Sequence, residues 1–276
     1  MTQTMTELDE RMRVQRSFHA HAAEYDRHAC VQKRVVAQLT RLVAAEGGEP
    51  RRVLDIGTGT GALVTALIPL LPAAWFAGLD LALGMCRVAR ERFAGCGRGV
   101  VFTGDAEALP LRDDIFDLVV STSVFQWLAD PVPAFAESLR VLRPGGRFCF
   151  ALFGSSTLHE LRDSYRRAYA ATGLGEEHRT RRFRTATQVE VALAAAGFAA
   201  TRVWSDLETL TYPNVAALLR AVRGVGAGAT SAPATRGLAE RRVMLAMMDL
   251  YRRDYGREEG IPATYEVVYG VGTKQS

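Results

Sequence analysis

The chain has 276 residues, of which 48% are hydrophobic and 23% charged, and its formal net charge is +4. This composition is that of a globular protein whose core is large enough to fold without disulfide staples. The small net charge does not by itself indicate nucleic-acid binding. No apolar run approaches the roughly 18 residues of a membrane span, and the polar first segment lacks a signal-peptide core. We therefore expect a cytoplasmic protein without a nucleic-acid or membrane partner.

The cysteines give no sign of a metal site or a disulfide framework. Cys30, Cys86, Cys96 and Cys149 form no C-x-x-C pair. Such spacing is typical of reduced thiols rather than of zinc ligands. We expect no bound metal.

Helices are predicted first along the chain. Val35, Val36 and Leu39 recur at helical spacing, and Gly47-Gly48 ends the pattern. Strand-like and helical segments then alternate up to Gly154, which predicts an α/β fold with a mainly parallel sheet covered by helices on both faces. The strands are expected at "RVLDIG", Trp75–Asp80, Val100–Asp105, Phe116–Ser123 and after Pro144, with helices at Ala62–Leu71, Leu83–Phe93 and Pro131–Leu142.

The pattern changes after Gly154. Two helices, a strand at Ala199–Tyr212, a long helical stretch rich in Gly and Ala, and a closing strand at Thr264–Lys274 complete a seven-stranded sheet. We interpret residues 1–276 as a single domain with an N-terminal helical cap (1–48), a ligand-binding core (49–155) and a substrate-side half (156–276). A helical insertion at about 205–260 is expected to form a lid over one edge of the sheet.

Three glycines mark the turn from the first strand to the first helix. The segment "RRVLDIGTGTGALVTAL" contains Gly57, Gly59 and Gly61 at alternate positions. In an open parallel sheet this turn is the usual ligand site, where glycines let the backbone approach the ligand and let the helix pack closely. A dinucleotide and S-adenosylmethionine are both candidates. The spacing differs from the dinucleotide pattern G-x-G-x-x-G, and Asp55 at the strand end suits a cationic ligand.

Two further aspartates follow the next strands. Asp80 closes the second strand, where an ionised carboxylate can accept both hydroxyls of a ribose diol. Asp105 closes the third strand, where it can accept from an adenine amine. Each alone could be an ordinary surface residue, but acidic residues at three successive strand ends indicate one ligand site. Met85 is either a packing surface for adenine or a core methionine.

The pattern Asp–x–Gly–x–Gly–x–Gly resembles that of the class I, Rossmann-like methyltransferases, as does "FDLVVSTSVFQWLADP" after the fourth strand. This resemblance covers about residues 50–155. It implies S-adenosylmethionine as methyl donor and S-adenosylhomocysteine as product. The donor-binding residues that it implies are Tyr25, Asp55, Gly57, Thr58, Gly59, Asp80, Leu81, Met85, Asp105, Ala106, Ser121 and Gln126.

Segments outside this core are similar to one branch of the class, the malonyl-acyl-carrier-protein O-methyltransferases of biotin synthesis (BioC). "SFHAHAAEYDRHACVQ" resembles their N-terminal motif Phe–x(6)–Tyr–Asp/Glu–x(2)–Ala–x(2)–Gln. "LLRAVRGVGAGATS" resembles their lid motif, and "PATYEVVYGVGTK" resembles their closing strand. The likeness spans nearly the whole chain; the extra length in "GAGATSAP" departs from the pattern.

The resemblance implies methyl transfer to the free carboxylate of a malonyl thioester. A carboxylate is ionised at neutral pH and needs no general base, so catalysis rests on orientation in a desolvated pocket. An arginine would orient the carboxylate by its fork geometry, and Arg182 and Arg220 are the candidates. Tyr25 and Phe125 are expected to shape the methyl-transfer pocket. The histidines His19, His21 and His28 are interpreted as surface residues.

The partner is expected to be a malonyl-loaded acyl carrier protein or malonyl-CoA, and the chain a monomer. The segment Glu176–Thr185, with four arginines and one histidine, is either a patch for an anionic partner or a solvated loop. Two other functions remain open. One is methylation of a quinone, sterol or phenol, which would require a base near the donor. The other is a non-enzymatic S-adenosylmethionine-binding module.

Overall fold

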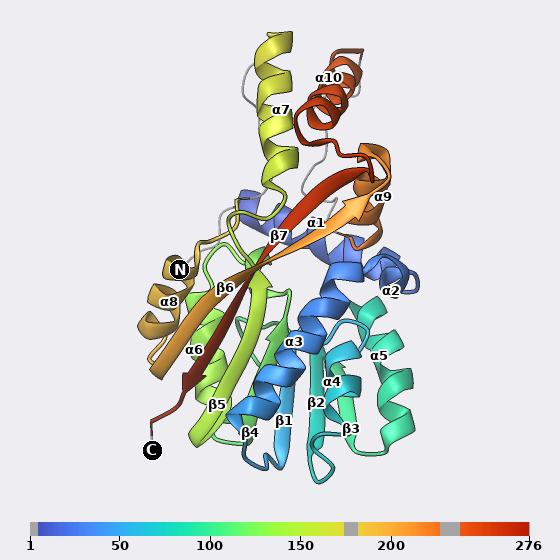
Figure 1. Ribbon diagram of the computed structural model, residues 1–276. Helices are drawn as coiled ribbons and strands as arrows, with labels where there is room; N and C mark the ends of the chain where they lie inside the picture. Colours follow the sequence, from blue (N-terminus) through green and yellow to red (C-terminus); the bar gives the residue numbers. More distant parts are fainter. Residues whose placement is uncertain (1–4, 174–181, 227–237, 276) are drawn as a thin grey trace.

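The computed structural model describes residues 5–173, 182–226 and 238–275. Over these ranges the strands form one seven-stranded sheet in the order β3-β2-β1-β4-β5-β7-β6 (Figure 1). The predicted α/β architecture is confirmed. The strands are β1 (Arg52–Ile56), β2 (Trp75–Asp80), β3 (Gly99–Thr103), β4 (Phe116–Thr122), β5 (Leu142–Phe153), β6 (Ala199–Tyr212) and β7 (Ile261–Thr273).

The strand order reverses beside β1. This strand pairs in parallel with β2 on one side and with β4 on the other, and β5 is parallel to β4. The last strand, β7, runs antiparallel to both β5 and β6. Ligands of open parallel sheets bind at the carboxyl ends of the strands where the order reverses. The glycine turn after β1 lies at that point.

Helices cover both faces of the sheet. On one face α3 (Cys30–Glu46), α4 (Ala62–Leu67) and α5 (Leu83–Cys96) pack through residues such as Leu39 and Phe93. On the other face lie α6 (Val132–Val141) and α8 (Ala186–Ala195), packed through residues such as Phe135 and Leu193. The interior strands are apolar on both sides because both sides are covered.

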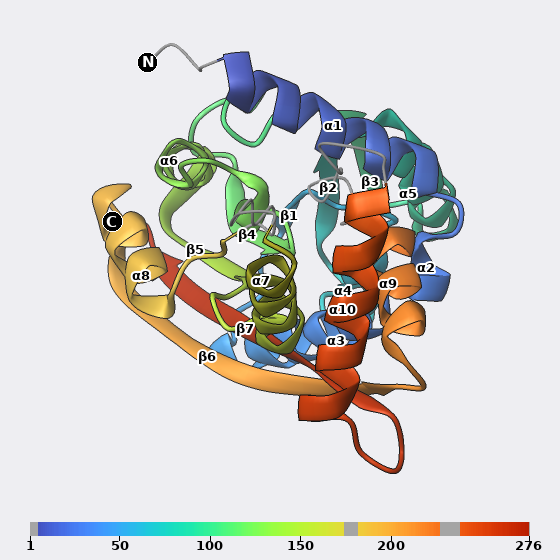
Figure 2. The same cartoon turned by 90° about the horizontal axis from the view of Figure 1, so that it is seen from above.

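The remaining helices gather at the carboxyl end of the sheet. Helices α7 (His159–Thr172) and α10 (Leu238–Tyr255) rise side by side above it, with α9 (Val215–Gly224) near their base (Figures 1 and 2). Seen from above, α1 (Met5–His21) lies across this end, and α2 (Tyr25–His28) follows it toward α9 (Figure 2). No helix among the described residues is long and apolar enough to cross a membrane.

Three element boundaries differ from the sequence-based expectation. Strand β6 ends at Tyr212, as the sequence predicts, so the helical insertion begins after that residue and not at about residue 205. The long paired stretch with β7 explains the difference, since the ladder runs to the pair Tyr212 and Ile261. Helix α4 ends at Leu67, and β3 ends at Thr103 with Asp105 in an isolated bridge to Ala108.

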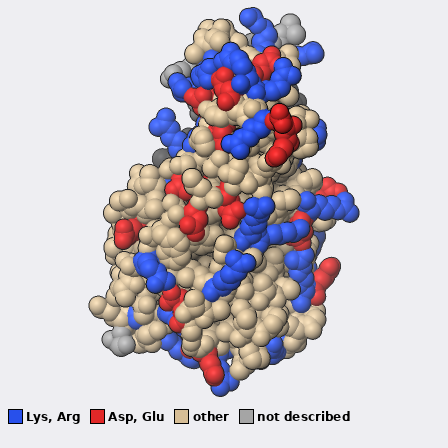
Figure 3. Space-filling model, viewed as in Figure 1, with Lys and Arg blue, Asp and Glu red and all other residues tan. Residues whose placement is uncertain are grey.

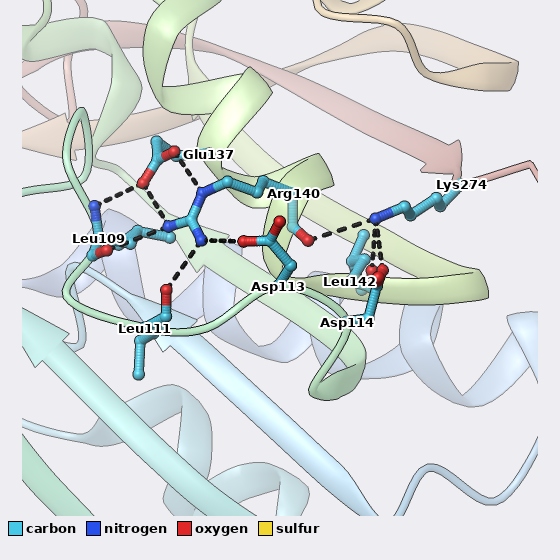
Figure 4. A network of polar contacts seen from close by, with 8 residues as sticks. All are labelled: Leu109, Leu111, Asp113, Asp114, Glu137, Arg140, Leu142 and Lys274. Carbon is cyan, nitrogen blue, oxygen red and sulfur yellow. Dashed lines mark hydrogen bonds and ion pairs between the residues drawn. The ribbon is translucent and has the colours of Figure 1, made fainter.

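A polar network fixes the loop that follows Asp105. Arg140 on α6 donates to Glu137, to Asp113 and to the carbonyls of Leu109 and Leu111 (Figure 4). Glu137 in turn accepts from the Leu109 backbone N–H at 2.7 Å. One side chain therefore satisfies several backbone groups of an irregular loop, which would otherwise lack partners. The network holds the loop, with Asp105 at its start, against the sheet.

Candidate active site

Three neighbouring cavities open at the carboxyl end of the sheet among the described residues. The aspartate cavity lies at the ends of β2 and β3, the glycine-loop cavity lies beside the turn after β1, and the α9 cavity lies between α9, β6 and β7. Seven of the predicted donor-binding residues line the aspartate cavity: Tyr25, Gly57, Asp80, Leu81, Met85, Asp105 and Ala106.

Asp80 is held by two backbone donors. Its Oδ2 accepts from the Gly59 N–H at 2.9 Å and its Oδ1 accepts from the Ala82 N–H at 2.8 Å. Burial raises the pKa of Asp80, while the two backbone hydrogen bonds lower it. The carboxylate is thus tied to the glycine turn and to the start of α5, with lone pairs still directed at the cavity that it lines.

The first helix closes the aspartate cavity from above. Arg11 forms ion pairs with Asp105 and with Glu107, the latter at 2.7 Å. Gln15 donates to the Leu81 carbonyl at 2.9 Å, and Arg11 and Gln15 both line the cavity. Asp105 is therefore neutralised by a residue that the sequence analysis did not single out. Arg11 lies about 94 positions from Asp105 in the chain, so no local pattern pointed to the pair.

The glycine turn adopts a conformation that side chains resist. Gly57 has φ +68°, and a Cβ there would lie 2.0 Å from the Val124 side chain. Gly59 has φ +54° with open space around it, and Gly61 has φ +83° and lies against Ala89 of α5. Position 57 therefore requires glycine for two reasons: the positive φ and the close contact with Val124.

Asp55 lies beneath this turn and does not line any of the three cavities. It is 1% exposed, and its Oδ2 accepts from the Thr58 hydroxyl at 2.8 Å. Its Oδ1 is buried without a hydrogen-bond partner. Burial raises the pKa of Asp55 to about 7, the Thr58 hydrogen bond lowers it and the charge of Asp80 raises it. Thr58 lines the glycine-loop cavity, so Asp55 reaches that cavity through its neighbour.

The N-terminal motif lies directly over the glycine turn. Asp26 accepts from the Thr60 hydroxyl at 2.9 Å and forms an ion pair with Arg92 of α5. The preceding residue, Tyr25, borders the cavities, and burial together with the charges of Asp80 and Asp26 raises the pKa of its phenol. Asp26 thus ties α2 to the turn and to α5 and fixes where Tyr25 stands.

Tyr25 and Ser123 border all three cavities. Ser123 follows β4 with φ +59°, an unusual value for a residue with a side chain, and its N–H donates to the Ala151 carbonyl at 2.8 Å. Phe18 and Trp127 stand edge to face, with ring centroids 5.5 Å apart, and line both the aspartate and the α9 cavity. These residues form the junction between the cavities.

Phe125 is not part of this junction, contrary to the sequence-based expectation. The side chain is 0% exposed and stacks edge to face on Phe135 and Phe148 in the core. It lies in the short helical turn Phe125–Trp127, which points successive side chains in different directions. Gln126 of the same turn lines the α9 cavity. Ser121 is buried and donates to the Ile56 carbonyl at 2.8 Å, which joins β4 to β1 below the cavities.

The two candidate arginines do not line the α9 cavity. Arg220 is exposed on α9, next to the lining residues Ala221 and Val222. Arg182 is exposed beside the lining residue Phe183. The neighbouring side chains that line the cavity, Ala221, Val222 and Phe183, are apolar. We refer to these two exposed arginines as the rim arginines.

Most of the basic segment Glu176–Thr185 lies outside the described residues, including Arg181. Within the described part, Arg184 donates to the Leu128 carbonyl at 3.2 Å and to the Ala129 carbonyl. It therefore braces the loop after β4, where the sequence had suggested an anionic-partner patch or a solvated loop.

The interpretation of the three histidines as surface residues is wrong for His28 but holds for His19, whose side chain is exposed. His28 is partly buried and lines the α9 cavity. His19 accepts from the Gly84 N–H at 3.0 Å and pins α1 to α5. Gln32, the last residue of the N-terminal motif, lines both the α9 and the glycine-loop cavity. The signal that could have found His28 is its spacing, midway between the motif residues Tyr25 and Gln32.

Comparison with known proteins places this geometry in a family. Residues 54–150 match a family described as a methyltransferase domain. A malonyl-[acyl-carrier protein] O-methyltransferase of Geobacter sulfurreducens is 49% identical over 96% of this chain and 99% of the relative. The chain belongs to the malonyl-[acyl-carrier protein] O-methyltransferase family. A second member, from Methylococcus capsulatus, is 38% identical over 91% of this chain and 90% of the relative.

Solved structures resemble the fold of this methyltransferase. The YcgJ protein of Bacillus subtilis superimposes with a TM-score of 0.58 and 20% identity, over 87% of this chain and 99% of the other. A phosphoethanolamine N-methyltransferase of Haemonchus contortus, solved with S-adenosyl-L-methionine, gives a TM-score of 0.57 and 18% identity over 94% of this chain and 57% of the other. At these identities the likeness shows the class I methyltransferase fold.

Proposed function

We propose that this chain transfers a methyl group from S-adenosylmethionine to the free carboxylate of a malonyl thioester borne by an acyl carrier protein. The names of its relatives support this substrate class. The observation that carries the proposal is the junction at Tyr25 and Ser123, which borders all three cavities. A donor in the aspartate and glycine-loop cavities would present its methyl group there to an acceptor in the α9 cavity.

The residues around the first two cavities fit this donor. Asp80 offers carboxylate lone pairs to a ribose diol, and Met85 and Ala106 offer apolar surface to an adenine ring. The buried Oδ1 of Asp55 has no partner, and Thr58 beside it borders the glycine-loop cavity. A positive charge there would favour the ionised form of Asp55. These residues would hold the adenosine and methionine parts of the donor.

The chemistry demands little of the chain beyond placement. When bound, the donor supplies an activated methyl group on a sulfonium. A carboxylate oxygen forms a bond to the methyl carbon as the carbon–sulfur bond breaks and leaves its electron pair on sulfur, and no proton moves. The acceptor is already ionised at neutral pH. Phe18, Tyr25 and Trp127 at the junction would exclude water and hold the reacting atoms in line.

The helices above the sheet suit a protein-borne substrate. We infer that residues 213–226 and 238–260 contribute to a lid, since α9 supplies Ala221 and Val222 to the α9 cavity and Val225, directly after the helix, lines it as well. Basic side chains gather over the projecting helices in the face drawn in Figure 3. Acyl carrier proteins are acidic as a class, so this charge favours a carrier over a neutral partner. Arg162 donates to the Ser155 and Thr157 carbonyls; the other arginines of α7, α9 and α10 are Arg166, Arg167, Arg220, Arg223, Arg241, Arg242, Arg252 and Arg253.

The proposal is tested by supplying S-adenosylmethionine with malonyl carrier protein, malonyl-CoA or a phenol and measuring release of S-adenosylhomocysteine. Mass spectrometry of the acceptor identifies the malonyl methyl ester. Methylation of the malonyl carrier protein is expected, with no reaction of the phenol. Release with the phenol alone would favour a small-molecule methyltransferase. Donor binding without any release would favour a non-enzymatic module.

A further inference from the structure

The α9 cavity contains an unexpected kind of polar group. None of its described lining residues is Asp, Glu, Lys or Arg. The side chains with polar atoms that line it are His28, Gln32, Ser123, Gln126, Trp127, Thr157 and the three tyrosines Tyr25, Tyr212 and Tyr265. A carboxylate that enters this cavity therefore meets no arginine from the described lining, and within that lining its contacts come from neutral donors or from an imidazole.

Among the described residues, the His28 and Gln32 side chains stand without hydrogen-bond partners, as do the hydroxyls of Tyr25 and Ser123. The Gln32 Oε1 is moreover a buried atom. Other polar groups of the lining are paired. The Tyr212 and Tyr265 hydroxyls lie 3.3 Å apart, and Thr157 donates to the Glu266 carbonyl at 3.0 Å. Buried polar groups normally find a partner, so the His28 and Gln32 side chains are suited to receive one from a ligand.

The lid holds the His28 ring in place. Gly224, the last residue of α9, approaches the ring so closely that a Cβ at this position would lie 2.3 Å from His28 Cγ. Gly224 does not require a positive φ, so the glycine is needed for this contact and not for the backbone conformation. Gly224 of the lid motif therefore leaves room for His28 of the N-terminal motif.

We propose that His28 orients the carboxylate of the methyl acceptor by donating a hydrogen bond to it, with Gln32 beside it and Gly224 fixing the imidazole. This inference rests on the proposed function. An imidazole engages one carboxylate oxygen and leaves the other for reaction, whereas an arginine fork takes both. The rim arginines, Arg182 and Arg220, are then left for the carrier rather than for the malonyl group.

The test measures binding and turnover separately. Binding of malonyl-pantetheine in the presence of S-adenosylhomocysteine is measured by calorimetry for the wild type and for His28→Phe, His28→Asn and Gly224→Ala. His28→Phe and Gly224→Ala should weaken binding at least tenfold, and His28→Asn, which keeps a donor, less than about threefold. The affinity for the donor should not change in any variant. Alanine suits a helix better than glycine, so Gly224→Ala should remain folded by circular dichroism.

His159→Asn serves as the control, because His159 is exposed at the start of α7 and should leave binding unchanged. Unchanged binding in His28→Phe would overturn the inference. A second result would also overturn it: His28→Asn binds malonyl-pantetheine like the wild type but loses as much turnover as His28→Phe. That result would make His28 a general base. Failure of the wild type to methylate any malonyl thioester would instead refute the proposed function. The binding arm would still report whether His28 holds the carboxylate.

Discussion

The Asp26 carboxylate accepts a hydrogen bond of 2.9 Å from the hydroxyl of Thr60, and this contact joins the N-terminal cap to the glycine turn. Arg92 from α5 completes the cluster. Because Tyr25 precedes Asp26, the same contact determines where the Tyr25 ring stands over the cavities. The cap is therefore a part of the candidate donor site and not a separate unit attached to it.

Removal of this contact should weaken donor binding. Asp26→Ala is expected to lower the affinity for S-adenosylmethionine about tenfold, since hydrogen bonds to charged groups contribute about 1.5–3 kcal/mol and water replaces part of that at a half-exposed site. Calorimetry measures the change. Glu24→Ala is the matched control, because within the described part of the chain the Glu24 side chain pairs only with the exposed Arg27. Equal affinities for Asp26→Ala and the control would show that the cap does not shape the donor site.

Asp80 should contribute directly to donor affinity. Asp80→Ala is expected to weaken binding by about 1.5–3 kcal/mol, the range for hydrogen bonds to a charged group. The exposed Asp249 on α10 provides a control in Asp249→Ala. Thermal unfolding distinguishes lost ligand contacts from a loosened glycine turn, since Asp80 also accepts from Gly59 and Ala82. A folded variant with parental donor affinity would remove Asp80 from the site.

Asp55 should make stability depend on pH in the absence of donor. Burial raises its pKa from 3.8 to about 7, so the unfolded chain loses this proton first as pH rises. The stability contribution is complete below about pH 3.8 and is lost as pH rises to about 7. Relative to Asp55→Asn, the wild type should lose up to about 4 kcal/mol over this window, at about 1.36 kcal/mol per pKa unit. Urea unfolding at several pH values measures the difference; parallel curves for the two proteins would contradict it.

Phe125 should act on stability rather than on catalysis. Phe125→Leu removes ring contacts from the core and is expected to lower the free energy of unfolding by about 1–3 kcal/mol. Turnover of the folded variant should stay near the parental value. Trp127→Leu, at the junction of the cavities, should raise KM or lower kcat with a smaller cost in stability. The sequence-based role for Phe125 would be restored by a large drop in kcat for Phe125→Leu at unchanged stability.

Charge on α9 should affect carrier substrates selectively. Reversal of Arg220 and Arg223 to Glu is expected to raise KM for malonyl carrier protein several-fold and to leave a small malonyl thioester nearly unaffected. Added salt should reduce the difference, because the Debye length is about 8 Å at physiological ionic strength. Arg52→Glu is the control, because Arg52 begins β1 and lies at the end of this strand that is remote from the glycine turn. Equal effects on both substrates, or no effect of salt, would exclude α9 as a docking surface.

The sequence alone determined the sheet, the glycine turn and the positions of Asp80 and Asp105. These are local properties, because the spacing of apolar residues along a short segment indicates a strand or a helix. Parallel strands then bring their carboxyl ends to one edge of the sheet. The end of β3 near Asp105 and the residue at which the helical insertion begins were predicted less accurately, because they depend on pairing with strands that lie elsewhere in the chain.

Only the tertiary structure decided which side chains face the cavities. Phe125 and Trp127 stand two residues apart, yet one lies in the core and the other at the junction, because a short helical turn separates their directions. The ion pair of Arg11 with Asp105 and the contact of Gly224 with His28 join segments that are distant in sequence. Such contacts follow from the packing of α1, α2 and α9 over the sheet, and local residue patterns carry no information about that packing.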